Sequence, residues 1–153
     1  MSDLRATPLR LGAVGYLNAR PLVFRLEHRP GFQLRYDVPS RCADLLHEGA
    51  IDVGLIPSIE YLRAPRHEQY RIVPDLAIGS NGPVASVMLY AIRPIARVRS
   101  LALDVSSRTS VALLRVFCAR CFHIAPVLAT RGPDLASMLA GADAALIIGD
   151  AAH

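Results

Sequence analysis

The sequence VGYLNARP, residues 14–21, decides how the rest of the chain is interpreted. It follows an apolar stretch that begins at Leu9 and has the composition of a β-strand. Gly15 permits a sharp turn and Pro21 stands at a favoured first position of a helix, so Asn18 is expected to cap that helix. Asn18 would then point beyond the carboxyl end of the strand, which is where ligands bind in open α/β sheets.

The composition excludes several classes of protein. The chain has 153 residues, of which 52% are hydrophobic, and this is enough for one domain or for two small lobes sharing a cleft. It has no lysine, which excludes Schiff-base chemistry by a lysine amine and a Walker-type phosphate site. The net charge of +4 comes from scattered arginines, which favours a small anionic ligand over nucleic acid. No apolar stretch is long enough to span a membrane and the N-terminus has no export signal, so we expect a cytoplasmic protein without membrane contact.

The three cysteines, Cys42, Cys118 and Cys121, cannot form a disulfide framework. Cys118 and Cys121 form a CxxC motif, which alone is compatible with a redox pair or half a metal site. No second pair follows and the motif lies late in a helical pattern, so we interpret both cysteines as packing residues. His123 leaves the metal alternative open, but the other histidines keep no ligand spacing, and we expect no metal.

Apolar patterns and turn residues predict alternating strands and helices, and therefore an α/β fold. We expect strands within residues 9–14, 32–38, 51–57, 71–78, 84–92, 101–105, 123–130 and 143–149. We expect helices within residues 21–29, 40–49, 58–64, 106–122 and 133–140. Ser40 and Ser58 are expected to cap two of these helices. Glu60 lies in a first helical turn, where its carboxylate favours the helix dipole, so we expect a structural role before a catalytic one.

Two stretches are rich in hydrogen-bond donors. Residues 79–83, GSNGP, form either an ordinary hairpin turn or a ligand loop with hydroxyl, amide and backbone N–H donors, and the composition leaves both open. Residues 106–110, SSRTS, stand before and within the first turn of the longest predicted helix. The positive amino end of a helix attracts carboxylates and phosphates, and capping requires one such residue rather than five. We therefore predict an anion site at residues 106–110.

The chain also contains an internal echo. Residues 46–56 are matched, two residues shorter, by residues 139–147, and each stretch closes a β-α-β-α-β series. The echo predicts two lobes, the first over residues 1–92 and the second over residues 93–153. Two such lobes with facing strand ends would form a clamshell. Its cleft would be lined by Asn18, Ser80 to Ser86 and Ser106 to Ser110.

Five stretches in order carry a family resemblance: VGYLNARPL, DLLHEGAIDVGLIPSIEY, SNGPVASV, LALDVSSRTSVALLR and DAALIIGDAA. Together they resemble the chorismate dehydratases of the futalosine route to menaquinone, over nearly the whole chain. The resemblance implies a fold similar to the type II periplasmic binding proteins, in which hinge strands join two α/β lobes. Members of that family are considerably longer, so the resemblance also implies an incomplete fold whose C-terminal return segment is missing. We expect the chain by itself to be marginally stable or prone to aggregation.

The resemblance implies a lyase that eliminates water from chorismate to give 3-[(1-carboxyvinyl)oxy]benzoate. Aromatisation drives this reaction, so the site needs orientation, charge stabilisation and a route for one proton, without a metal or cofactor. Asn18 would be the catalytic residue that orients the leaving hydroxyl or the enolate-like intermediate. One substrate carboxylate would be held by Ser107, Thr109 and Ser110 with Arg108 as a bidentate partner, and the other by Ser80, Asn81 and Ser86 from the first lobe. The base stays open, and a substrate carboxylate could itself serve.

Three other functions share this clamshell. A solute-binding protein for small anions would need an export signal, which the N-terminus lacks. The ligand-sensing domain of a transcription regulator would follow a helix-turn-helix segment, but only eight residues precede the first predicted strand. The sister enzyme 1,4-dihydroxy-6-naphthoate synthase has the same fold, although the YLNARPL turn is more similar to the dehydratase. The sequence does not predict an oligomeric state.

Overall fold

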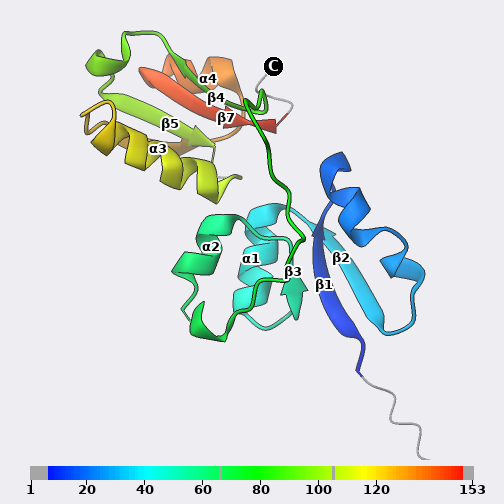
Figure 1. Ribbon diagram of the computed structural model, residues 1–153. Coiled ribbons are helices and arrows are strands. Elements are labelled where there is room, and N and C mark those ends of the chain that lie inside the picture. Colours follow the sequence, from blue (N-terminus) through cyan, green and yellow to red (C-terminus); the bar gives the residue numbers. More distant parts are fainter. Residues whose placement is uncertain (1–6, 66, 105, 150–153) are drawn as a thin grey trace, which may run out of the picture. The chain divides into compact units, whose positions relative to one another are not determined.

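The computed structural model describes residues 7–65, 67–104 and 106–149 (Figure 1). The chain divides into two units, Met1–Gly79 and Ser80–His153, each of which combines a β-sheet with helices. The predicted α/β class is therefore confirmed. The division differs from the boundary expected after residue 92, because the strand over residues 87–91 pairs within the second sheet.

The first unit, Met1–Gly79, contains a three-stranded parallel sheet. Its strands are β1 (Leu9–Val14), β2 (Phe32–Asp37) and β3 (Val53–Gly54), in the order β2-β1-β3. Two α-helices, α1 (Pro39–His47) and α2 (Ser58–Arg63), accompany this sheet, and Figure 1 shows β1 beside β2. The three strands lie where the apolar patterns predict them.

The segment after β1 differs from the predicted α-helix. It forms two 3-10 helices, η1 (Leu17–Val23) and η2 (Leu26–His28), separated by Arg25 at a positive φ of 63°. Pro21 lies inside η1 rather than at its start, and Tyr16 occupies the N-cap position. The prediction that Asn18 caps a helix is therefore wrong. A proline within this stretch removes a backbone donor, which is compatible with short 3-10 turns and opposes a longer α-helix.

Helices α1 and α2 of the first unit do not begin as the sequence analysis predicted. Ser40 and Ser58, which we expected to cap helices, lie inside α1 and α2, and the actual N-cap residues make no side-chain cap bond. Pro39 begins α1 one residue earlier, because its fixed φ suits the first helical position. Gly49 has a φ of 71°, as expected of a glycine just after the end of a helix.

Residues 71–78 form no strand in the structure, contrary to our prediction. Pro74 interrupts their apolar pattern and cannot donate a ladder hydrogen bond. Ile72, Leu76 and Ile78 are exposed as a result. A short 3-10 helix, η3 (His67–Gln69), precedes this extended segment.

The second unit, Ser80–His153, contains a four-stranded mixed sheet. Its strands are β4 (Val87–Ala91), β5 (Ser100–Asp104), β6 (Val127–Arg131) and β7 (Ala144–Ile148), in the order β4-β7-β5-β6. Strands β5, β6 and β7 are parallel, whereas β4 runs antiparallel to β7. Its helices are α3 (Arg108–Arg120), α4 (Leu135–Ala140) and the 3-10 helix η4 (Ile95–Arg97).

The core of the second unit has two faces, because successive residues of a strand point to opposite sides of the sheet. One face packs against α3, and its buried residues are Val98, Leu101, Leu103, Leu114, Cys118, Ala144 and Leu146. The other face packs against α4, and its buried residues are Ala102, Met138, Ala145 and Ile147. The sheet is therefore covered on both sides, and burial of each leucine side chain contributes about 1.5–3 kcal/mol.

The internal echo corresponds to a repeated topology. In each unit three parallel strands follow one another along the chain, and the first strand lies between the other two, as β2-β1-β3 and as β6-β5-β7. The chief difference is that the connection between the first two strands contains η1 and η2 in the first unit but α3 in the second. The repeat predicted from the sequence is present in the order of the strands.

Each of the two matched stretches contains an aspartate directly before its last strand, and the contacts of these aspartates explain why. The Asp52 carboxylate accepts from the backbone N–H of Arg10 at 2.9 Å and from the Arg10 side chain at 2.6 Å. The Asp143 carboxylate accepts from the backbone N–H of Arg99 at 2.9 Å and from the Arg93 side chain at 2.7 Å. In both units the aspartate ties the start of the third strand to the start of the first.

These bonds predict how acid destabilises the first unit. Hydrogen bonds from Arg10 lower the pKa of Asp52 to about 2. Because the pKa is lower in the folded state than its ordinary value of about 3.9, the carboxylate stabilises the fold above about pH 4 and loses this effect as the pH falls toward 2. Asp52→Asn should therefore flatten the fall of the unfolding free energy between about pH 4 and 2, as measured by denaturant unfolding across a pH series.

Asp75→Asn is a suitable control for this experiment, because Asp75 is exposed. It should leave the pH dependence unchanged. High salt should reduce the difference between the natural protein and Asp52→Asn, because Arg10 and Asp52 are partly solvent-accessible. Identical slopes for the natural protein and Asp52→Asn at low salt would contradict the prediction.

Candidate functional site

The carboxyl edge of the second sheet is the candidate site. From β5 the chain passes through α3 to β6 on one side, and from β6 through α4 to β7 on the other side of β5. The strand order thus reverses between β5 and β7, and ligands of open α/β sheets bind beyond the carboxyl ends of strands at such a reversal. Those ends are Asp104 in β5 and Ile148 in β7.

The residues that follow β5 form a tight hydrogen-bond network. Asp104 is only 4% exposed, and its Oδ1 accepts from the backbone N–H of Ser106 at 3.0 Å and from its hydroxyl at 2.6 Å. Ser107 is the N-cap of α3, and its Oγ accepts from the backbone N–H of Ser110 at 3.3 Å. The hydroxyls of Ser107 and Ser110 lie 2.8 Å apart and share a hydrogen bond.

This network reduces the number of donors that a ligand can use. The Ser106 hydroxyl hydrogen points to Asp104, and one hydrogen of the Ser107 and Ser110 pair lies between the two oxygens. One hydroxyl hydrogen of this pair is left over. Arg108 and Thr109, the first two residues of α3, are half-buried and each takes part in an interaction within the chain. The helix start therefore offers fewer hydroxyl donors than its sequence suggests.

Ser86 lies at the same edge of the same sheet. Its carbonyl oxygen accepts from the backbone N–H of Gly149 at 2.9 Å, directly after β7, and the neighbouring Val87 pairs with Ile148. Because β4 is antiparallel to β7, the amino end of β4 meets the carboxyl end of β7. The structure therefore brings Ser86 to the edge that carries the start of α3.

Ser80 and Asn81 begin the second unit and are exposed. The Ser80 hydroxyl donates to the carbonyl of Gly82 at 3.0 Å, within the loop. We expected Ser80, Asn81 and Ser86 to face the substrate from the first lobe. All three belong to the second unit instead, because β4 is a strand of the second sheet.

Asn18 follows the carboxyl end of β1 in the first unit. It is the second residue of η1 and is exposed, and no hydrogen bond of its side chain occurs among the described residues. Strand β1 lies between β2 and β3, so the first sheet has the same reversal of strand order as the second. Asn18 thus lies beyond the carboxyl end of β1, although not as a helix cap, and its role in ligand binding stays a prediction.

The cysteines lie at the other end of α3. Cys118 is buried in the core, and burial raises the pKa of its thiol, whereas Cys121 is exposed at the C-cap of the helix. The packing interpretation holds for Cys118 but not for Cys121. Within residues 7–65, 67–104 and 106–149, no group of three or more His, Cys, Asp or Glu side chains is arranged to bind a metal ion.

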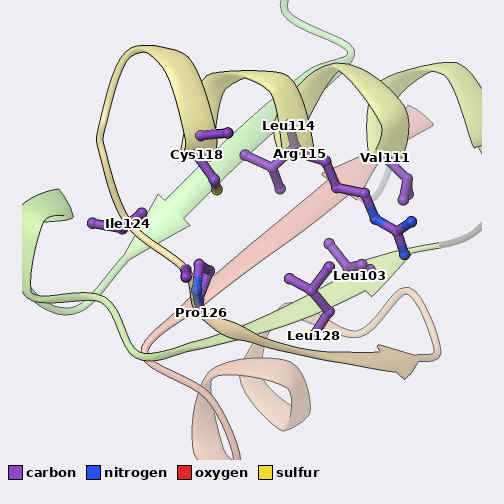
Figure 2. A pocket seen from close by; sticks show the side chains of 10 residues that line it. Leu103, Val111, Leu114, Arg115, Cys118, Ile124, Pro126 and Leu128 are labelled. Atoms are coloured by element: carbon purple, nitrogen blue, oxygen red, sulfur yellow. The ribbon is translucent and has the colours of Figure 1, made fainter.

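A cavity of about 240 Å³ lies between α3 and the sheet of the second unit. Figure 2 shows Leu114 and Cys118 on α3 and Leu103 and Leu128 on the strands around this space. Its lining is mostly apolar, with Arg115 as the charged exception, and it contains none of the predicted site residues. Because an apolar lining does not suit a carboxylate, we do not assign this pocket to the predicted anion site.

Comparison with known proteins decides the family. Residues 9–152 match a family described as menaquinone biosynthesis. The chain belongs to this menaquinone biosynthesis family. It is also 32% identical over 147 residues to a chorismate dehydratase of Thermus thermophilus, an alignment that covers 95% of this chain and 52% of that relative. The chain therefore spans about half the length of this curated relative, and the resemblance found in the sequence is confirmed.

Two sets of side-chain contacts in this member of the menaquinone biosynthesis family were not predicted by the sequence analysis. Asp104 ends an apolar strand and resembled an ordinary strand terminus, although an acidic residue two positions before a serine is a pattern that fixes a turn. Glu60 is buried against His47, whose other ring nitrogen bonds Tyr70. His47 and Tyr70 are far apart in the sequence and carry no spacing signal.

Among the described residues, no helix is long and apolar enough to cross a membrane.

Proposed function

We propose that the chain carries substrate-binding and catalytic residues of a chorismate dehydratase, a lyase that eliminates water from chorismate to give 3-[(1-carboxyvinyl)oxy]benzoate. The observation that supports this most strongly is the alignment with the Thermus thermophilus chorismate dehydratase, which covers 95% of the chain. The family match to menaquinone biosynthesis points to the same pathway. The proposal includes a two-lobed fold of the type II periplasmic-binding-protein kind for the natural full-length protein, and a cytoplasmic location.

The chemistry of chorismate defines what the residues must do. Chorismate carries two carboxylates, a secondary ring hydroxyl and an adjacent ring C–H that the ring carboxylate acidifies through a double bond. Loss of water across these positions makes the ring aromatic, so the protein has to orient the substrate, stabilise charge that moves into the carboxylate and conduct one proton. Hydroxyl, amide and helix-end donors suit these tasks.

In this proposal the start of α3 binds one carboxylate. The helix end supplies backbone N–H groups and a partial positive charge, and Arg108 adds a full positive charge. Thr109 and the remaining hydroxyl of the Ser107 and Ser110 pair are the other donors to this carboxylate. Ser86, at the same edge of the sheet, takes part in binding the other carboxylate together with Ser80 and Asn81. Asn18 orients the leaving hydroxyl.

Incubation with chorismate tests the function directly. The natural full-length protein should consume the diene absorbance of chorismate and release an aromatic product whose mass is lower by one water molecule. Binding of chorismate without turnover would favour an anion-binding protein of the same fold. Formation of 1,4-dihydroxy-6-naphthoate from its own precursor instead would favour the sister naphthoate synthase, and either result would contradict the proposal.

Thr109→Ala should mainly weaken substrate binding. A hydrogen bond from a hydroxyl to a carboxylate contributes about 1.5–3 kcal/mol, so the dissociation constant should rise by about 10- to 150-fold. Titration calorimetry with the aromatic product measures this without interference from turnover. The expected change in kcat is much smaller, because the bond is present in both the ground state and the transition state.

Thr109→Ser is the matched control, because it removes a methyl group and keeps the hydroxyl. It should bind the product almost as tightly as the natural protein. Equal weakening by Thr109→Ser and Thr109→Ala would assign the effect to packing at the first turn of α3, and unchanged binding by Thr109→Ala would remove Thr109 from the site.

A further inference from the structure

We draw no further inference here: the strongest candidate, the cluster of Glu60, His47 and Tyr70 beside a space of about 520 Å³ at the carboxyl end of α1, has side chains that bond to one another through the imidazole, and nothing in the part of the chain that the structure describes points to a ligand there.

Discussion

Under the dehydratase function that we propose, Asn18→Ala should lower the kcat for chorismate by about 10²- to 10³-fold, the usual effect of removing one side chain that stabilises a developing charge. Asn18 is exposed beyond the carboxyl end of β1, and its side chain has no hydrogen-bond partner among the described residues. Removal of its amide therefore breaks no hydrogen bond within the part of the chain that the structure describes. Steady-state kinetics with chorismate and calorimetry with the aromatic product should show a large loss of kcat and a small change in binding.

Leu17→Ala is the control for this experiment. Leu17 precedes Asn18 in η1 and is 81% exposed, so its truncation disturbs the same 3-10 turn without removing a polar group. It should keep kcat within about twofold, as is usual for surface substitutions. An unchanged kcat for Asn18→Ala would remove Asn18 from the catalytic group. Equal losses for both variants would show that η1 acts through its backbone and not through the amide.

The sheets could largely be predicted from the sequence, because strands leave a local signal. The alternation over residues 32–38 is typical of a half-buried strand, and β2 covers residues 32–37. The apolar run before Gly149 predicts a strand covered on both faces, and four of the five residues of β7 are buried. Both signals depend only on neighbouring residues, so they can be identified without knowledge of the pairing.

Strand pairing and hydrogen bonds between residues far apart in the sequence could not be predicted in this way. The sequence analysis assigned Ser86 to the first lobe, because nothing in residues 84–92 shows that β4 pairs antiparallel with β7. In the same way, a count of hydroxyl groups at residues 106–110 predicts many donors. The structure shows that two of the four hydroxyl hydrogens are used internally, one in the bond to Asp104 and one in the bond between Ser107 and Ser110. Hydrogen-bond direction is a property of the folded chain, and it determines which groups remain for a ligand.

Glu60 makes contacts in the structure that the sequence did not indicate. We expected a structural role through the dipole of α2. Glu60 is 6% exposed, and its Oε2 lies 3.3 Å from Nε2 of His47, while Nδ1 of His47 lies 2.5 Å from the hydroxyl of Tyr70. Burial raises the pKa of Tyr70, so its phenol keeps its hydrogen near neutral pH. Nε2 faces the Glu60 carboxylate and Nδ1 faces the Tyr70 hydroxyl, an arrangement in which Nε2 donates to Glu60 and Tyr70 donates to Nδ1.

Glu60→Ala should lower the free energy of unfolding by about 2–3 kcal/mol. The substitution leaves the Nε2 hydrogen of half-buried His47 without its carboxylate and removes buried side-chain volume, and each unsatisfied buried group costs about 1–3 kcal/mol. Tyr70→Phe should cost about 1 kcal/mol, because it removes one hydrogen bond and keeps the ring that stacks on His47 at 5.7 Å. Urea unfolding followed by circular dichroism measures both values.

Glu48→Ala is the matched control, because Glu48 also pairs with a basic side chain, Arg41 at 3.2 Å, but is 55% exposed. Surface ion pairs contribute little, so this variant should lose less than about 1 kcal/mol. The double variant Glu60→Ala with Tyr70→Phe should lose less than the sum of the single losses, since both remove partners of one imidazole. Equal losses for Glu60→Ala and Glu48→Ala would show that the His47 network does not stabilise the first unit. Additive losses would show that Glu60 and Tyr70 act independently of His47.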